Sequence, residues 1–408
     1  RARELGLDTV NVGDYAGHAE YGGGEAVAAV VTHVDVVPAG EGWTDDPYVL
    51  EKRGGRLYGR GTADDKGAAV VALYCLKALK DEKVKCVRKA RAIFGAGEEI
   101  ASDDLKQYFQ REALPELAFT PDAEYGVCNR EKGILHVELS TPADGSRLES
   151  LHGGTVRNAV AASARAEARC TAEECEALEA LSKKMDGKFS FQWSGGVLTA
   201  ECAGRAAHAM EPQKGRNAAA RLVRLFSSCF GGEALGALWS FVDQKIGLEL
   251  DGSSLGIRRE DAVSGPLTVN LGVAEQDNGV CRAVLDIRYP VTADGEEIFE
   301  RLRAAAGAYG VKARVLAEQK PLFVPEDTPL IRMLKGAYET VTGGRARLYG
   351  TGGGTYARSL QNRGVAFGPV FPGEENHLHD ADEFIEIEKF MLHAQICLEA
   401  LFRMATQK

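Results

Sequence analysis

The order of apolar and polar positions in the first 132 residues predicts alternating strands and helices. Three short, continuous apolar runs predict strands, at 25–35, 89–97 and 115–122. Two segments repeat apolar residues at helical spacing and predict helices, at 66–83 and 101–113. This alternation predicts an α/β fold with a mostly parallel sheet and helices on both faces. Ligands of such sheets bind outside the carboxyl ends of the strands.

The stretch from 133 to 320 has a different pattern, in which polar and apolar residues alternate. Examples are "ILHVELS", "GVLTAECAG" and "RAVLDIRYPV", and two helices are predicted, at 172–185 and 216–230. Alternation of this kind is typical of antiparallel sheets with one face on a core. The helical pattern returns at 328–343 and 386–404. We therefore expect one domain formed by 1–132 and 321–408, with a second, α+β domain inserted at 133–320.

Composition and charge narrow the classes of partner. The chain has 408 residues, 45% of them hydrophobic, and a formal net charge of −10, which argues against a general partner role for nucleic acid or an anionic membrane. No apolar run reaches the roughly 18 residues that cross a bilayer. Nine scattered cysteines without a CxxC pair favour a reducing, cytoplasmic location. The opening "RARELGLDTV" lacks an initiating methionine, so we expect the native chain to start earlier.

Acidic and imidazole side chains follow each of the predicted strands. His33 and Asp35 are two residues apart and point the same way, so the carboxylate can orient a metal-binding ring, although a polar strand end is the simpler interpretation. Glu98 and Glu99 are adjacent carboxylates, which repel each other unless a cation or a proton lies between them. Asp122 lies at the end of the third segment.

Two further segments carry similar groups. Asp64 and Asp65 lie on a glycine-rich turn that opens a helix, where a simple helix cap is the alternative. The late loop "GEENHLHDADEF" offers His377 and His379, and composition does not choose between them. Together the segments supply histidines and carboxylates to one edge of a sheet, which is the ligand stock of a two-metal hydrolytic site. Nitrogen and oxygen ligands without thiolates suit zinc, with manganese or cobalt as substitutes.

With these segments in view, the chain resembles the zinc metallopeptidase family that includes aminoacylase, desuccinylase, carboxypeptidase G and the PepV-type bacterial dipeptidases. The resemblance to the dipeptidase branch rests on "HVDVVPAGEGW", "LYGRGTADDKG", "GAGEEIAS", "FTPDAEYGV", "NREKGI" and "GGGTYARSLQNRGVAFGPVFPGEENHLHDADEF". These motifs occur in order along nearly the whole chain. The resemblance implies a zinc-peptidase domain with an inserted lid that resembles a dimerisation domain.

The resemblance also implies a role for each matching residue. The implied metal ligands bind two Zn²⁺ per subunit, with Asp64 bridging: His33, Asp64, Glu99, Asp122 and His379. Asp35 orients His33, Glu98 is the general base and later acid for a water that bridges the metals, and His208 stabilises the oxyanion. The implied contacts with the substrate carboxylate come from Asn158, Arg288, Gly353, Gly354 and Thr355. The bond between Asp64 and Asp65 is where the family carries a cis peptide.

Two details bear on the substrate. In this family an aspartate at the position of Asp122 accompanies aminopeptidase and dipeptidase activity, whereas a glutamate accompanies deacylases and carboxypeptidases. The long insertion resembles the monomeric dipeptidase arrangement rather than the dimeric one, although a homodimer stays open. We therefore expect hydrolysis of unblocked dipeptides, with hydrolysis of N-acyl amino acids as the alternative, and a peptide-binding protein without catalysis as a third reading.

Overall fold

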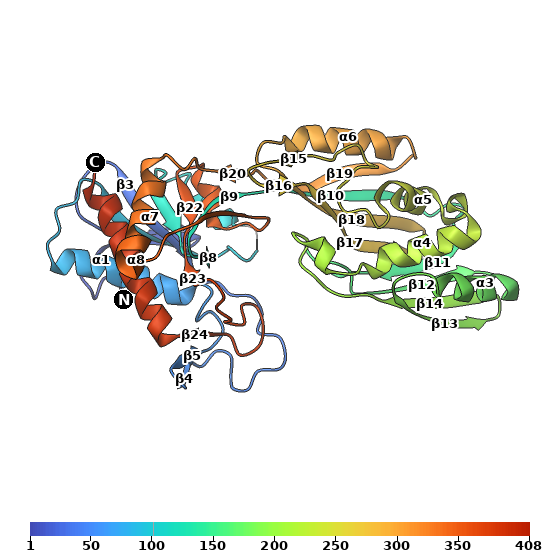
Figure 1. The fold of residues 1–408 in the computed structure, drawn as a ribbon, viewed down its shortest axis with the longest axis horizontal. Coiled ribbons are helices and arrows are strands. Elements are labelled where there is room, and N and C mark those ends of the chain that lie inside the picture. The colour runs from blue at the N-terminus through green and yellow to red at the C-terminus, as the bar shows by residue number, and fades with distance from the viewer. Residues whose placement is uncertain (101) are drawn as a thin grey trace. The chain divides into compact units, whose positions relative to one another are not determined.

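The structure is a computed structural model that describes residues 1–100 and 102–408. The chain folds into two compact units, formed by Arg1–Glu131 with Leu322–Lys408 and by Lys132–Pro321. Figure 1 shows the helices and strands of each. We refer to these as the discontinuous unit and the inserted unit.

A nine-stranded sheet forms the centre of the discontinuous unit, with strand order β1-β2-β6-β3-β7-β22-β9-β20 and β21 paired to β9. Its strands are β1 Asp8–Val12, β2 Ala16–Tyr21, β3 Val27–His33, β6 Lys89–Gly95, β7 Leu117–Thr120, β9 Val127–Glu131, β20 Leu322–Phe323, β21 Leu348–Thr351 and β22 Gly364–Ala366. Strand β3 pairs in parallel with β6 and β7, and β22 pairs in parallel with β7. The three apolar runs of the sequence therefore form adjacent parallel strands, as predicted. The outer strands β1 and β2 are antiparallel additions.

Both faces of this sheet are covered, because alternate residues of β3 belong to different hydrophobic clusters. Ala28 and Val30 pack in the cluster that contains α1 Lys66–Asp81, α7 Pro329–Thr342 and α8 Ile387–Thr406. Ala29 and Val31 pack in a smaller cluster with residues of α2 Asp103–Tyr108 and the 3₁₀ helix η4 Tyr356–Leu360. The α/β architecture with helices on both faces is confirmed.

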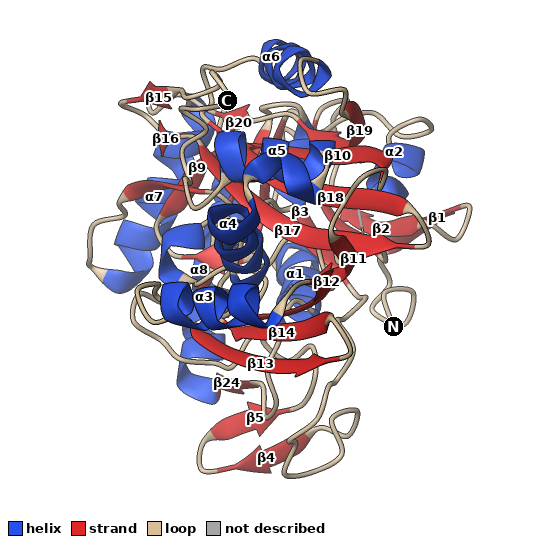
Figure 2. Cartoon of the chain, turned by 90° about the vertical axis from the view of Figure 1, so that its right-hand side faces the viewer, coloured by secondary structure: helices blue, strands red, loops and turns tan. Residues whose placement is uncertain are grey.

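The inserted unit is built on an eight-stranded antiparallel sheet, in the order β13-β14-β12-β11-β17-β18-β10-β19. Its strands are β10 Gly133–Pro142, β11 Leu148–Gly153, β12 Ser163–Arg169, β13 Lys188–Ser194, β14 Val197–Ala203, β17 Thr268–Asp277, β18 Val280–Tyr289 and β19 Lys312–Gln319. Figure 2 shows most of these strands as one red ladder with α3 Ala172–Ser182, α4 Ala218–Phe230 and α5 Ala237–Phe241 in front of it.

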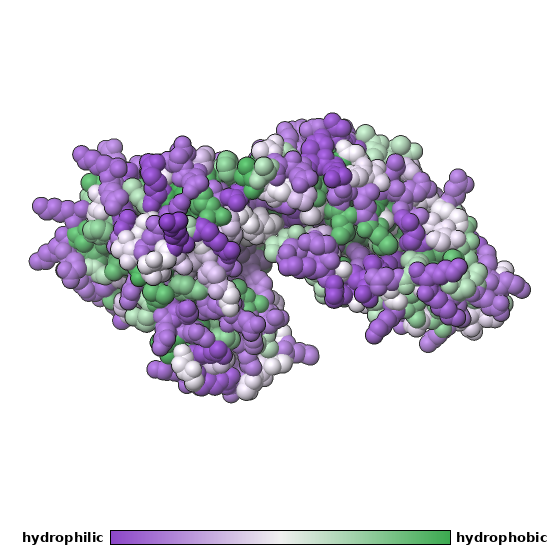
Figure 3. All heavy atoms as spheres, in the orientation of Figure 1, coloured by the Kyte–Doolittle hydropathy of each residue, from purple (hydrophilic) through white to green (hydrophobic). Residues whose placement is uncertain are grey.

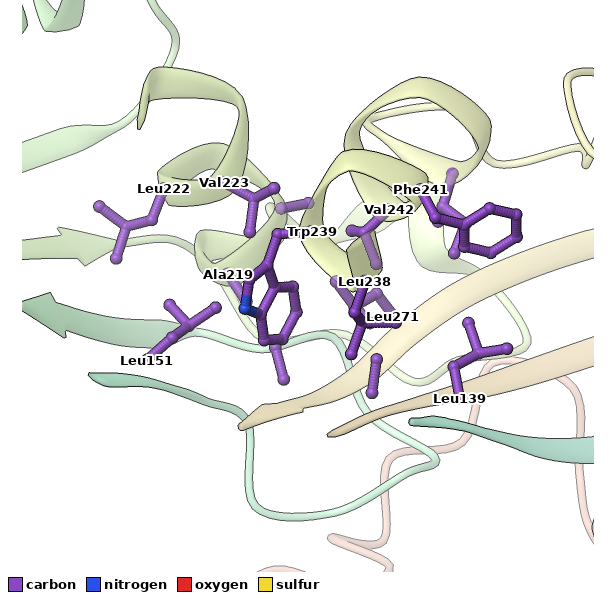
Figure 4. Close-up of a cluster of buried hydrophobic side chains, with 14 of the residues drawn as sticks. Leu139, Leu151, Ala219, Leu222, Val223, Leu238, Trp239, Phe241, Val242 and Leu271 are labelled. Atoms are coloured by element: carbon purple, nitrogen blue, oxygen red, sulfur yellow. The ribbon is translucent and has the colours of Figure 1, made fainter. Parts of the chain in front are cut away.

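The core of the inserted unit lies between these helices and one face of the sheet. Leu139, Leu151 and Leu271 from the sheet meet Leu222 and Trp239 from the helices (Figure 4). The helix count predicted from the sequence was too low, because the structure also has α5, which continues into a π turn at Val242–Ile246, and α6 Gly295–Gly307. Helix α6 buries only a narrow stripe of its surface, which is a weak signal in the sequence.

Shorter elements connect the larger ones. They are β4 Glu51–Arg53, β5 Arg56–Tyr58, β8 Ala123–Glu124, β15 Glu260–Asp261, β16 Gly265–Pro266, β23 Pro369–Val370, β24 Phe384–Glu386, η1 Pro212–Lys214 and η2 Gly232–Leu235.

Hydrophilic side chains cover much of the face drawn in Figure 3. Among the residues that the structure describes, no helix combines the length and the apolar character that a membrane crossing requires.

Candidate metal centre

The carboxyl ends of three neighbouring parallel strands bring the predicted ligands of the discontinuous unit to one edge of its sheet. His33 is the last residue of β3, Glu98 and Glu99 follow the end of β6, and Asp122 follows the end of β7. Because β3 lies between β6 and β7, these side chains converge around His33.

Asp64 lies between two imidazole rings that come from opposite ends of the chain. His33 Nε2 is 2.8 Å from Asp64 Oδ1, and His379 Nε2 is 3.0 Å from Asp64 Oδ2. His379 Nε2 is also 3.4 Å from Glu99 Oε1. The other late histidine, His377, instead contacts the carbonyl oxygen of Ala381, with its Nδ1 at 3.2 Å. Of the two histidines in that loop, His379 is the one that meets the acidic cluster.

Two sets of side chains place their ligand atoms close enough together to hold a cation. His33, Asp64 and Glu99 form one set, and His33, Glu98 and Asp122 form the other, with all the atoms of a set within 4.8 Å of one another. Adjacent Glu98 and Glu99 therefore serve different sets. Glu98, which the resemblance gives a role in proton transfer, lies beside Asp122 and His33.

Burial and the charges of neighbouring residues shift the pKa values of several side chains in this cluster. Burial raises the pKa of Glu98 to about 8, and the neighbouring charge of Glu99 acts in the same direction while His33 opposes it. Burial, with the charges of Asp64 and Glu98, also raises the pKa of Asp122 well above its ordinary value. Hydrogen bonds to Asp64 and Glu99 raise the pKa of His379 to about 10.

Two acidic side chains hold the backbone on which the cluster is built. Asp35 accepts hydrogen bonds from the amides of Glu98 (3.3 Å) and Glu99 (3.1 Å), and its Oδ1 is 3.4 Å from His33 Nδ1. Asp35 therefore fixes two successive residues of the turn in addition to lying against the imidazole ring.

Glu383, a fully buried acid that belongs to the motif around His379 but received no role from the sequence, holds the turn that carries Asp64. It accepts hydrogen bonds from the amides of residues 61, 63 and 64, at 2.9 to 3.2 Å, and from Arg60 Nη1 at 2.7 Å. The peptide bond between Asp64 and Asp65 is cis, as the resemblance implies. The only sequence signal for Glu383 is its place four residues after His379.

The three predicted residues of the inserted unit lie near a buried polar row on its sheet. Ala159 pairs with His208 in an isolated bridge, so Asn158 and His208 belong to facing segments, and both side chains are exposed. Asn270 of β17 donates to the carbonyl oxygen of Ala159 at 2.9 Å. Across the sheet, Asn270 is directly opposite Asp286 of β18.

Arg288 is buried, whereas the sequence pattern alone suggested a surface ion pair. Its Nε and Nη2 lie 2.6 and 2.7 Å from the two carboxylate oxygens of Asp286, and His136 Nε2 lies 3.1 Å from the same carboxylate. Burial favours the neutral acid, but the hydrogen bonds of His136 and Arg288 hold the pKa of Asp286 below its ordinary value. The alternating pattern missed this because residues on both faces of β18 are buried from Ala283 to Tyr289.

The glycine-rich loop is anchored inside the discontinuous unit. The amide and the hydroxyl of Thr355 both donate to the buried carboxylate of Glu131, at 3.3 and 2.8 Å. Arg358 donates to the carbonyl oxygen of Gly353 at 2.6 Å, and Gly354 is exposed. Both donors of Thr355 are thus engaged within the protein, and a role of this loop in substrate binding stays a prediction.

The donor set fits divalent cations. It consists of imidazole nitrogens and carboxylate oxygens, the ligand types of zinc and manganese. Acids whose pKa values are raised by burial and by one another become favourable as anions when a cation is close. The carboxylates of this cluster are therefore more favourable beside a bound divalent metal than they are without one.

Comparison with known proteins places the chain in a family. Residues 29–403 match the sequence model described as "Peptidase family M20/M25/M40". YtjP of Bacillus subtilis (strain 168), which carries a provisional dipeptidase name, is 36% identical over 409 residues, covering 98% of this chain and 88% of its own. The Beta-Ala-Xaa dipeptidase of Lactobacillus delbrueckii subsp. lactis is 31% identical over 417 residues, covering 99% of this chain and 87% of its own.

Solved structures show the same fold at lower sequence identity. The metallo-carboxypeptidase Sso-CP2 from Sulfolobus solfataricus gives a TM-score of 0.61 at 16% identity, covering 98% of this chain and 91% of its own. The aminoacylhistidine dipeptidase from Vibrio alginolyticus gives 0.57 at 14% identity, covering 100% and 91%. The family match spans most of the chain and includes every residue of the acidic cluster, so the protein is a peptidase that belongs to family M20/M25/M40.

Proposed function

We propose that this peptidase is a dinuclear zinc dipeptidase, with Mn²⁺ or Co²⁺ as substitute metals, that hydrolyses unblocked dipeptides. The observation that carries the proposal is the position of Asp64, whose two carboxylate oxygens contact His33 and His379 separately. A carboxylate placed in this way suits a bridge between two cations. The dipeptidase names of the relatives from Bacillus and Lactobacillus support the substrate class.

The metals would be held by two groups of side chains that share Asp64. We assign His33 and Asp122 to one ion, and Glu99 and His379 to the other. Divalent cations at such positions lower the pKa of water and polarise the carbonyl group of the scissile bond.

The chain itself would move the protons. Glu98 takes a proton from the attacking water, whose oxygen then bonds to the scissile carbonyl carbon. Glu98 returns that proton to the amine nitrogen as the C–N bond breaks, which releases two amino acids. The ligand atoms of His33 and Asp122 lie within 4.8 Å of the Glu98 carboxylate, which supports a proton-transfer role beside the ion that these two residues would hold.

We assign the remaining roles from the family resemblance. His208 donates a hydrogen bond to the oxyanion of the tetrahedral intermediate. Arg288 and Asn158, with the loop at Gly353, Gly354 and Thr355, bind the carboxylate of the substrate. Asp286 supports the role of Arg288 because its bidentate contact fixes the plane of the guanidinium group.

We also propose that the protein works as a monomer in the cytoplasm. The inserted unit spans Lys132–Pro321, and its length resembles the monomeric dipeptidase arrangement, which supports a lid that does not need a second copy. All nine cysteines lie in the described part of the chain as free thiols, which is typical of a reducing compartment. Light scattering coupled to gel filtration distinguishes a monomer from a homodimer.

A competition assay tests the function. Zinc-loaded protein receives a free dipeptide, its N-acetyl counterpart and a tripeptide together, with Glu98→Ala as the matched control. Cleavage of the free dipeptide alone, lost in the control while zinc binding is retained, supports the proposal. Faster cleavage of the N-acetyl compound would identify a deacylase instead, and cleavage of none of the three would favour a binding protein.

A further inference from the structure

A buried acid and a buried tyrosine form a hydrogen-bonded pair behind the turn that carries Glu98 and Glu99. Asp104, from α2, is 6% exposed, and Tyr356, the first residue of η4, is fully buried. The Tyr356 hydroxyl donates to Asp104 Oδ2, and the two residues are 252 positions apart in the sequence. Neither residue has a role in the chemistry described so far.

This pair contacts the turn directly. Asp104 Oδ2 accepts a hydrogen bond from the amide of Ala96 at 2.7 Å, and the Tyr356 hydroxyl accepts one from the amide of Gly97 at 3.4 Å. A side chain at Gly95 would place its Cβ 2.1 Å from the Tyr356 hydroxyl and 2.5 Å from Asp104 Oδ2, so the backbone lies against both.

The contacts of this pair continue those of Asp35 along the chain. Asp104 and Tyr356 hold the amides of residues 96 and 97, and Asp35 holds those of residues 98 and 99. Three side chains thus fix four successive amides. Two of these amides belong to Glu98 and Glu99, whose carboxylates lie near different residues. Directed hydrogen bonds of this kind determine where the attached side chains point.

Tyr356 also contacts the neighbouring strand end. Its ring meets the ring of His33 edge to face, with 6.1 Å between the ring centroids. One side chain therefore touches the imidazole group and, through its hydroxyl, the glutamate turn. A packing role alone requires only the ring, whereas the hydroxyl is directed at the turn.

We propose that Tyr356 and Asp104 are positioning residues. They hold the turn at residues 95–99 so that the carboxylate of Glu98 lies near Asp122 and that of Glu99 lies near Asp64. This inference rests on the roles proposed above for Glu98 and Glu99. Loss of the hydroxyl frees the amide of Gly97 and one contact of Asp104, so the turn relaxes and both glutamates move from their partners.

The test compares two tyrosine hydroxyls from the same hydrophobic cluster. Tyr356→Phe keeps the ring against His33 and removes only the hydroxyl. Tyr108→Phe is the matched control, because Tyr108 is fully buried in the same cluster and its hydroxyl contacts His18 Nδ1 at 2.8 Å and Arg91 Nη1 at 3.1 Å. Each variant is measured for kcat and KM on a free dipeptide, for Zn²⁺ affinity by competition with a chromophoric chelator, and for urea unfolding.

We expect Tyr356→Phe to lower kcat and Zn²⁺ affinity about 10–100-fold with little change in KM, as loss of a group that orients metal ligands does. Tyr108→Phe should lose a similar amount of stability with kcat and Zn²⁺ affinity unchanged. The double variant of Tyr356→Phe with Asp104→Asn should lose no more kcat than the more impaired single variant, because the two residues act as one unit.

Wild-type kcat and Zn²⁺ affinity in Tyr356→Phe would overturn the inference, as would equal losses in Tyr108→Phe. The Zn²⁺ titration separates this inference from the proposed function. If the wild-type protein binds Zn²⁺ but cleaves no dipeptide, the proposed function fails, and the comparison of Zn²⁺ affinities still decides whether Tyr356 positions the turn.

Discussion

The regions around His33 and around Arg288 use acidic side chains in different ways. Around His33, the partly buried Asp35 and the buried Asp104 and Glu383 accept hydrogen bonds from backbone amides of turns that follow strands. In the inserted unit, Asp286 lies inside a strand and accepts from the side chains of His136 and Arg288. Amides inside a sheet are already paired, whereas those of a turn need other partners.

This difference indicates which property of each unit a single substitution would change. The shape of the turns around His33 depends on a few carboxylates, so one substitution can displace residues of the cluster. The backbone at Arg288 is held by the sheet, so loss of Asp286 alters charge and side-chain orientation but leaves the strand in place.

The largest effect is expected at Glu383. Glu383→Gln replaces a charged acceptor of several donors and leaves Arg60 buried without a counter-charge, so the free energy of unfolding should fall by about 3–5 kcal/mol. Zn²⁺ affinity should fall with it, because the turn that carries Asp64 loses its anchor. Urea unfolding and chelator competition measure the two. A loss under about 1 kcal/mol would contradict the dependence of this turn on Glu383.

A smaller effect on stability, without an effect on Zn²⁺ affinity, is expected at Asp286. Asp286→Asn keeps one acceptor oxygen but removes the charge beside buried Arg288, at a cost of about 2–3 kcal/mol. Zn²⁺ affinity should be unchanged, because the altered contacts lie within the inserted unit. The same two assays measure both quantities. Reduced Zn²⁺ affinity in this variant would show that the contrast between the units is wrong.

A third effect is a pH dependence of the metal-free protein. Burial raises the pKa of Glu98 from 4.5 to about 8, so the folded state binds more protons than the unfolded state between these values. Stability should therefore fall as the pH rises through this window. The raised pKa of His379, about 10 against an ordinary 6.5, acts in the same direction at higher pH.

Urea midpoints of chelator-treated protein at about pH 5.5 and about pH 8.5 measure this dependence. Added Zn²⁺ should reduce the difference, because a cation favours the ionised carboxylates. Glu98→Gln should reduce it as well in the absence of metal. Equal midpoints for the metal-free wild-type protein at both pH values would contradict the expectation.

The smallest effect is expected on the exposed edge of the inserted sheet. Arg314 is 69% exposed and its Nη2 lies 2.7 Å from Glu138 Oε1. Arg314→Ala should change the free energy of unfolding by no more than about 0.5 kcal/mol, as is usual for exposed ion pairs. Urea unfolding measures this change in free energy. A loss as large as that of Asp286→Asn would mean that the exposure of an ion pair does not indicate how much the pair contributes to stability.

Much of the fold could be predicted because its signals are local. The runs that became β3, β6 and β7 are continuous and apolar, and their ends locate His33, Glu98 and Asp122 in the sequence. Helix α8 repeats its apolar residues at helical spacing over its whole length. Helix α6, which buries only a narrow stripe, and the antiparallel pairing of β1 with β2 were not predicted.

The scaffold of the site could not be predicted, because its contacts join distant positions. Glu383 is 319 residues from the amide of Asp64, and Tyr356 is 252 residues from Asp104. No spacing rule within one segment connects such residues. The sequence motifs indicated which side chains could bind a metal, whereas the hydrogen bonds that direct them required the folded chain.

The placement of His379 against Asp64 has a consequence for biosynthesis. The imidazole rings of His33 and His379 are separated by nearly the whole chain, and α8, which completes the larger cluster of the discontinuous unit, comes later still. A ribosome must therefore reach the codon of residue 379 before the pair of histidines exists. Chains that stop before this residue lack half of the arrangement, so hydrolytic activity should emerge only after it has been synthesised.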